Sequence, residues 1–224
     1  SWRIMFVVTA ILGVISTILL LIFKTGKLEK QQELKVKEIG QIFKIRNFNL
    51  MVLAMILYVG ADVGVWGWIS TLFKQQFNIT PFKASLTVGV FWTFMIIGRM
   101  SSARLSDKIG LRKLILLLSI GGTVVTFLCA VVNTELSLWI LLALIGLFYS
   151  GIWPTIVAFT GKATGKYSTS AYFLIVAAGG VGGMVFPYLL GVLGKAASIS
   201  VTLGSISVMM MGIVVLTMLS REKS

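Results

Sequence analysis

Residues 98–114, GRMSSARLSDKIGLRKL, form a short basic stretch between two apolar runs that are each long enough to cross a bilayer. Gly110 can take the positive φ that a sharp reversal of the chain requires. The stretch holds a single carboxylate, that of Asp107, and four cations lie close to it in sequence: Arg104, Lys108, Arg112 and Lys113. Because the C-terminal end of a helix repels an anion, we expect nearby cations or another helix's N-terminus to balance Asp107.

The composition is typical of a membrane protein. Hydrophobic residues make up 57% of the chain, charged residues only 12%, and the mean hydropathy is +0.98. The net charge of +13 falls in short connections beside apolar runs, so membrane orientation explains it better than nucleic-acid binding. The sequence has no histidine and one cysteine, Cys129, which argues against zinc sites, disulfide frameworks and Cys–His catalysis. We therefore expect no enzyme, no metal and no cofactor.

The hydropathy pattern predicts an all-α polytopic membrane protein with about seven transmembrane helices. The predicted spans are residues 4–23, 48–73, 82–100, 114–132, 136–159, 171–193 and 201–219. Sixteen of the twenty Lys and Arg residues fall in alternate connections; the other four are Arg3, Lys74, Lys83 and Lys195. The positive-inside rule therefore predicts that residues 24–46, the 98–114 stretch and the C-terminus are cytoplasmic.

The basic stretch resembles the loop motif of the major facilitator superfamily, Gly-x-Leu-Ala-Asp-Arg-x-Gly-Arg-Lys, which occurs between helices 2 and 3 and, in weaker form, between helices 8 and 9. The matching positions here are Leu105, Ser106, Asp107, Lys108, Gly110 and Arg112. Ala103 replaces the leading glycine, and Leu111 replaces the first basic residue after the second glycine. The alternative is a positively charged cytoplasmic hairpin of an unspecified membrane protein.

The opening Trp2-Arg3-x-x-Phe6 resembles the start of helix 6 in the same superfamily. The resemblance implies that residues 1–23 are helix 6, residues 24–46 the cytoplasmic loop between the two halves, and residues 47–224 the C-terminal six-helix half. The Asp107 stretch then falls between helices 8 and 9. We therefore expect a fragment whose partner is the missing N-terminal half of the same protein. Within residues 24–46 the pattern fits an interfacial helix or a disordered linker.

Helix starts and helix rise give expected depths. Asn47 is expected to cap the span 48–73, and Thr80 with Pro81 the span 82–100. At 1.5 Å per residue, Asp62 lies roughly 21 Å from the cytoplasmic start of its helix, past the midplane. Arg99 lies roughly 27 Å from the outer face, so we expect it near the cytoplasmic end, out of reach of Asp62 and paired with Asp107.

One predicted face carries the residue types that a sugar site needs. Tyr58, Asp62 and Trp66 recur at i, i+4 and i+8, which places two rings and a carboxylate on one side of a helix. Rings cover the apolar face of a sugar, while a carboxylate accepts its hydroxyl hydrogens. A carboxylate inside a span is costly unless a wet cavity or a partner receives it, so Asp62 is interpreted as functional; a structural ion pair is the alternative. An interfacial tryptophan belt is the alternative for Trp66.

Three further aromatic residues complete the candidate site. Trp92 lies roughly 16 Å into its predicted helix, near the midplane, where its indole N–H needs a partner. Tyr149 and Trp153 are four residues apart beside Pro154, which should weaken their helix, and the glycines of residues 179–183 should weaken the next one. Close helix packing is the alternative role of these glycines. The candidate solute-binding residues are Tyr58, Asp62, Trp66, Trp92, Tyr149 and Trp153.

Three stretches resemble the fucose and hexose proton symporter group within the superfamily: YVGADVGVWGW at 58–68, FWTFMIIGR at 91–99, and GIWPTIVAF at 151–159 with GGVGGMVFPYLLG at 179–191. That group more often has glutamate where this chain has Asp62. The resemblance implies secondary active transport, by alternating access in the plasma membrane, of a small neutral solute such as a sugar with proton coupling. The expected partners are the lipid bilayer, the solute and a proton. A half-length membrane component or remnant that does not transport is the alternative.

The resemblance also implies a conformational role for the basic stretch. Its contacts would stabilise one state of the transport cycle and break in the other. The residues expected to take part are Arg99, Arg104, Asp107, Lys108, Gly110, Arg112 and Lys113.

Overall fold

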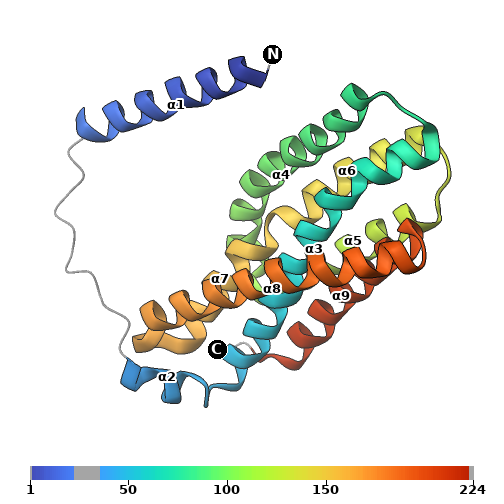
Figure 1. Cartoon of the computed structure of the whole chain (residues 1–224). Helices are drawn as coiled ribbons and strands as arrows, with labels where there is room; N and C mark the ends of the chain where they lie inside the picture. Colours follow the sequence, from blue (N-terminus) through green and yellow to red (C-terminus); the bar gives the residue numbers. More distant parts are fainter. Residues whose placement is uncertain (1, 23–35, 222–224) are drawn as a thin grey trace. The chain divides into compact units, whose positions relative to one another are not determined.

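The computed structural model of the chain describes residues 2–22 and 36–221 (Figure 1). The chain divides into two compact units, Ser1–Glu33 and Leu34–Ser224. In the first unit, α1 (Trp2–Ile22) is one uninterrupted apolar helix. Residues 23–35, which include much of the predicted inter-half loop, lie outside the described part of the chain.

The second unit is built entirely of helices within its described residues, which confirms the predicted all-α class. The helices are α2 (Val36–Ile42), α3 (Arg46–Phe77), α4 (Pro81–Ile109), α5 (Leu111–Val131), α6 (Glu135–Ser150), α7 (Ile152–Thr164), the 3₁₀ turn η1 (Gly165–Tyr167), α8 (Ser168–Ala196) and α9 (Ile199–Leu219).

Each predicted span falls on one of these helices, except that the span 136–159 covers both α6 and α7. Within the described residues, five segments are long and apolar enough to cross a membrane: Arg46–Phe77, Pro81–Ile109, Leu111–Val131, Glu135–Ala196 and Ile199–Leu219. The longest, Glu135–Ala196, contains the two predicted spans 136–159 and 171–193. The shorter apolar helix Phe6–Ile22 corresponds to the first predicted span.

Glycines bring α8 into close contact with α3, which packs against α4, α7, α8 and α9. A Cβ added at Gly182 would lie 2.1 Å from the carbonyl oxygen of Ile56, and one added at Gly179 would lie 3.1 Å from Val59. α8 runs without a break through these glycines and through Pro187. The expected weakening of this span therefore produces no break, and close packing explains the glycines that face α3.

The span 136–159, by contrast, is broken where the sequence predicted weakness. α6 ends at Ser150 and α7 begins at Ile152, with Gly151 between them. Pro154 has no N–H to donate to the preceding turn, and its ring disfavours an unbroken helix. The Tyr149 carbonyl at the end of α6 accepts a hydrogen bond from the Tyr58 hydroxyl at 2.9 Å, so α3 helps to satisfy the break.

Small residues also let α4 lie against the broken helix. A Cβ added at Gly98 would meet the Ser150 Oγ at 2.3 Å, and one added at Gly146 would meet the Phe91 carbonyl oxygen at 2.5 Å. Either contact would force the two helices apart. These glycines fix the spacing between α4 and α6.

The Asp107 stretch is mostly helical rather than a loop. α4 continues to Ile109 instead of ending near residue 100, and Gly110, with φ 85°, alone makes the turn into α5. The hydropathy pattern missed this extension because most of residues 101–108 are polar, although none of them breaks a helix. The predicted reversal at Gly110 is confirmed.

Side chains bind the end of α9 to two neighbouring helices. Arg112 donates hydrogen bonds to the carbonyl oxygens of Thr217 at 3.2 Å and Met218 at 2.9 Å. Asn47 donates to the Arg221 carbonyl at 2.6 Å and accepts from the Arg221 N–H at 3.1 Å. Asn47 is therefore not the predicted cap, because α3 already begins at Arg46.

Two other local predictions have a structural outcome. Thr80 caps α4 as expected, and its hydroxyl accepts from the Lys83 N–H at 3.4 Å. The described part of the 24–46 connection forms the short helix α2, whose Glu38 accepts a hydrogen bond from Ser170 of α8 at 2.7 Å. This part is ordered and packed on the bundle.

Candidate functional site

The observed helix bounds bring the predicted site residues to a common level. Asp62 lies at the middle of α3, and Met95 lies at the middle of α4. Arg99 is four residues beyond Met95, or about 6 Å. Its expected depth near the cytoplasmic end of the membrane stays a prediction, but Arg99 is close enough to Asp62 for its charge to act on that carboxylate. Arg99 therefore lies near the level of Asp62.

The other candidate residues fall close to the same level. Tyr58 and Trp66 lie four residues either side of Asp62, and Trp92 lies three residues before the middle of α4. Tyr149 and Trp153 flank the middle of the broken helix formed by α6 and α7. All lie within about 6 Å of the middle of their helices.

The two tyrosines are interior residues that join three helices. Tyr58 is 3% exposed and Tyr149 is fully buried, with ring centroids 6.2 Å apart. The Tyr149 hydroxyl lies 3.1 Å from the Thr126 Oγ1 on α5, in hydrogen-bond contact. Because both hydroxyls already have protein partners, this pair braces the break between α6 and α7.

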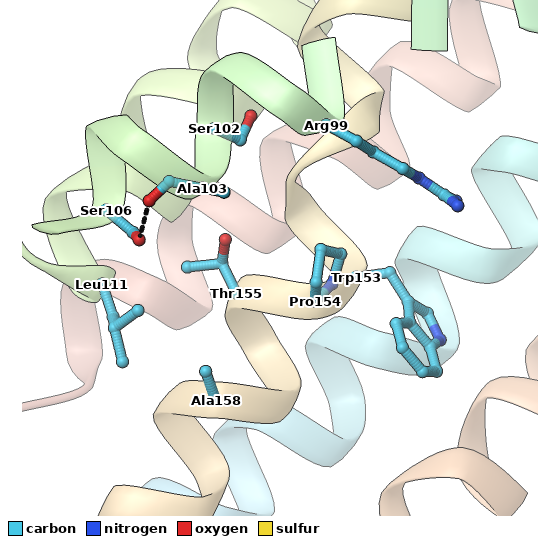
Figure 2. Close-up of a pocket in the computed structure, with 9 residues that line it drawn as sticks. All are labelled: Arg99, Ser102, Ala103, Ser106, Leu111, Trp153, Pro154, Thr155 and Ala158. Carbon is cyan, nitrogen blue, oxygen red and sulfur yellow. Dashed lines mark hydrogen bonds between the residues drawn. The ribbon is translucent and has the colours of Figure 1, made fainter. Parts of the chain in front are cut away.

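A cavity of about 420 Å³ opens beside this break, between α4, α7 and the start of α5 (Figure 2). Its lining residues are Arg99, Ser102, Ala103, Ser106, Leu111, Trp153, Pro154, Thr155 and Ala158. It brings together Trp153 and Arg99, which the sequence assigned to different roles. The sequence interpretation missed Ser102 and Thr155, although the i, i+3 spacing of Arg99 and Ser102 on one helix could have indicated a shared face.

Several hydrogen-bond donors line this cavity. The Arg99 Nη2 lies 3.7 Å from the Met95 Sδ, a weak acceptor. Within the described residues, neither the Trp153 indole N–H nor the Ser102 hydroxyl donates to a protein acceptor. Figure 2 shows Arg99 and Trp153 extending to the same side of the view, while Ser106 donates to the Ala103 carbonyl at 2.7 Å. The cavity therefore offers donors to a bound molecule.

Asp62 supplies a negative charge near the same level. The positive charge of Arg99 acts on the Asp62 carboxylate, but no direct ion pair joins them within the described residues. The buried Asp62 Oδ1 has no hydrogen-bond partner there. A charge at the centre of a membrane helix costs about 3 kcal/mol or more unless water or a partner receives it. Two such charges near one polar cavity indicate a functional region.

The remaining predicted tryptophans lie outside the cavity lining. Trp66 is 36% exposed and Trp92 is 40% exposed on the second unit. The Trp92 ring packs edge-on against Phe91 at a centroid distance of 5.7 Å. Both rings are therefore partly exposed on the surface of their helices.

The cations of the Asp107 stretch separate into two groups. Arg112 is half-buried against the end of α9, whereas Arg104, Lys108 and Lys113 are exposed, as is Asp107. Within the described residues, Asp107 forms no ion pair. The expected pairing with Arg99 is wrong, because the Arg99 side chain turns back along α4 toward Met95.

A second hollow lies beside α3. This groove of about 640 Å³ runs between α3, α8 and α9. Only apolar residues line it: Leu53, Ile56, Leu57, Phe186, Val208, Met211, Gly212, Val215 and Leu216.

The chain belongs to the major facilitator superfamily, whose family model matches residues 1–110 and 50–224. It is a multi-pass integral membrane protein. Major facilitator superfamily domain-containing protein 4A of Xenopus tropicalis is 30% identical over 141 residues, which cover 62% of this chain and 27% of that protein. The glucose/galactose transporter of Brucella abortus is 25% identical over 195 residues, covering 84% and 47%. A putative glucose/galactose transporter of Helicobacter pylori is 25% identical over 183 residues, covering 81% and 44%.

Solved structures agree with this assignment. The FucP major facilitator transporter in its outward conformation matches with a TM-score of 0.80 and 19% identity, covering 94% of this chain and 52% of that chain. The E. coli fucose:proton symporter FucP matches with a TM-score of 0.72 and 20% identity, covering 83% and 45%. The predicted superfamily and its likeness to the fucose and hexose group are confirmed. The chain spans less than half the length of the curated relatives named above.

Proposed function

We propose that this chain forms one half of a secondary active transporter that moves a small neutral polyhydroxylated solute, such as a hexose, with proton coupling. The observation that carries this proposal is the donor-lined cavity of Arg99, Ser102 and Trp153 near the middle of membrane helices, with Asp62 close to that level. The names of the relatives, glucose/galactose transporters, support the solute class. The fucose:proton symporter among the structural matches supports the coupling ion.

The proposed domain organisation follows the sequence assignment. Residues 1–23 act as helix 6, residues 24–46 as the loop between halves, and residues 47–224 as the six-helix half. The broken helix at Gly151 lies beside the cavity, as expected where irregular backbone lines a path in a membrane. Rocking of this half against the other would expose the cavity alternately to each side of the plasma membrane, with the C-terminus in the cytoplasm.

The proposed roles follow from position. Asp62 accepts solute hydroxyl hydrogens or carries the coupling proton, and Trp66, Trp92 and Trp153 supply rings for the apolar face of the solute. Tyr58 and Tyr149 hold the broken helix in place. In the basic stretch of residues 98–114, the switch region, Asp107 and the exposed cations near it would contact the other half in one state only.

Uptake by cells that express the complete gene product containing this chain tests the proposal. We expect accumulation of labelled glucose or galactose that collapses with the proton gradient. If Asp62 carries the coupling proton, Asp62→Asn should abolish accumulation but retain exchange of solute across the membrane. If Asp62 only binds the solute, accumulation and exchange should fall together. Absence of hexose uptake by the parent would contradict the proposed solute.

A further inference from the structure

The direction of the Arg99 side chain is unusual for a cation on a membrane helix. Long basic side chains normally turn toward the nearest membrane surface. Arg99 lies ten residues before the end of α4 at Ile109, so that surface is on the Ile109 side. Its guanidinium instead turns back by one helical turn, to 3.7 Å from the Met95 Sδ at the middle of α4. The weak sulfur contact does not compensate for this placement.

Several residues that line the same cavity as Arg99 carry hydrogen-bond donors. The Trp153 indole N–H and the Ser102 hydroxyl line the same cavity. The Thr155 hydroxyl already donates to the Gly151 carbonyl at 2.5 Å. Asp62 is the nearby anion, but it does not contact Arg99. A molecule with oxygen acceptors would therefore satisfy the Arg99 and Trp153 donors that line this cavity.

The charges near the cavity favour a neutral molecule. When Asp62 is ionised, its negative charge balances the positive charge of Arg99, so the pair is neutral overall. An anion would gain from Arg99 and lose from Asp62, whereas adjacent hydroxyl groups can accept from one and donate to the other. A guanidinium also presents two parallel N–H groups, which match two neighbouring oxygens.

We propose that Arg99 is a specificity-determining solute contact, whose guanidinium donates to two neighbouring hydroxyl oxygens of a polyhydroxylated solute. Another hydroxyl of the same molecule donates to Asp62. This inference rests on the proposed transport function and deepens it. It moves Arg99 from the switch region, where the motif placed it, to the solute site.

This contact is tested by measuring how protein variants and solute analogues, alone and in combination, change the binding affinity. The complete gene product, purified in detergent, is titrated with galactose, glucose and a set of their monodeoxy analogues. We expect the parent to bind at least one analogue about tenfold to a hundredfold more weakly than the hexose. The affinity of Arg99→Gln for the hexose should fall to that level, while its affinity for the same analogue should fall little further. Lys162→Gln, which removes an exposed charge at the end of α7 outside the cavity, is the matched control and should retain the parent's discrimination.

The outcomes separate this contact from the wider proposal. Equal weakening of every analogue by Arg99→Gln would show that Arg99 acts through the fold or the local charge, and would overturn the contact. Arg99→Lys keeps the charge and should fold even if Arg99→Gln does not; it should still lose the discrimination, and unchanged discrimination in Arg99→Lys would also overturn the contact. If the parent binds neither hexose, the proposed solute class fails first, and the contact fails with it.

Discussion

The two hollows of the second unit differ in chemistry more than in size. The groove between α3, α8 and α9 is the larger, at about 640 Å³, and its lining is entirely apolar. The cavity between α4 and α7 is smaller, at about 420 Å³, but holds a guanidinium, an indole and three hydroxyls. Apolar surface facing a bilayer is satisfied by lipid chains, whereas polar groups there need water or a ligand. Polar groups without partners therefore indicate the solute site better than volume does.

The packing behind the two hollows differs in the same way. α8 crosses α3 as one continuous helix, held close by glycines that leave no room for a side chain. The helix beside the polar cavity is broken at Gly151, and Tyr58 of α3 donates a hydrogen bond to the buried carbonyl of Tyr149. The first arrangement provides a rigid support, and the second provides a place for polar contacts.

The largest expected effect is at the rigid support. Gly182→Ala would place a Cβ 2.1 Å from the Ile56 carbonyl oxygen, so α3 and α8 must separate. We expect a loss of about 3 kcal/mol or more of stability, seen as poor yield and early thermal aggregation in detergent. Gly180→Ala, two residues away in open space, is the control. Equal stability of the two variants would contradict the close packing of α8 on α3.

Replacement of one residue in each hollow tests the functional contrast directly. Trp153→Ala should raise the KM for the solute by about tenfold, because a ring that covers the solute is lost. Val215→Ala, at a half-exposed position in the apolar groove, should leave the KM unchanged. Transport assays in proteoliposomes measure both. A larger effect from Val215→Ala would reverse the assignment of the two hollows.

A smaller effect is expected at the hydrogen bond between Tyr58 and Tyr149. Tyr58→Phe removes the hydroxyl that donates to the Tyr149 carbonyl at 2.9 Å and keeps the packed ring. The free energy of unfolding should fall by about 1 to 2 kcal/mol, because a buried carbonyl loses a partner. Tyr188→Phe, at a 72% exposed site on α8, is the control and should change little. Thermal melts in detergent distinguish the two.

The smallest expected effect is at the end of α9. Arg112→Ala removes two hydrogen bonds to the carbonyls of Thr217 and Met218, which end the helix. Hydrogen exchange should rise in the last turn of α9, by an amount equivalent to about 1 kcal/mol. Lys113→Ala removes an exposed charge next to it and should not change that exchange. Unchanged protection in Arg112→Ala would show that the bonds do not hold the helix end.

The sequence predicted the fold because its signals are local. Runs of about 20 apolar residues, the Gly110 turn and the Thr80 cap each depend on a few neighbouring residues, and all agree with the structure. Pro154 and Gly151 likewise indicated the weak point of the span 136–159. These features establish the helices and their order without any knowledge of packing.

The position of Arg99 could not be predicted in the same way. Hydropathy ended the helix near residue 100, yet the mostly polar residues 101–108 continue it to Ile109. Within the described part of the chain, the absence of a protein acceptor for Trp153 and Ser102 depends on helices distant in sequence. The hydrogen bond between the two tyrosines is likewise a long-range contact, since Tyr58 and Tyr149 are 91 residues apart.

Solute protection of a cysteine in the polar cavity tests the central claim most directly. Cys129 is buried, and a version of the complete gene product without reactive cysteines receives either Ser102→Cys or Val215→Cys. A charged methanethiosulfonate reagent should label position 102 from water, and saturating hexose should slow that labelling about tenfold, as expected for a site that the solute occupies. Position 215, in the apolar groove, should resist the reagent with or without hexose. Labelling at 102 that hexose does not change, or hexose protection at 215, would contradict the account.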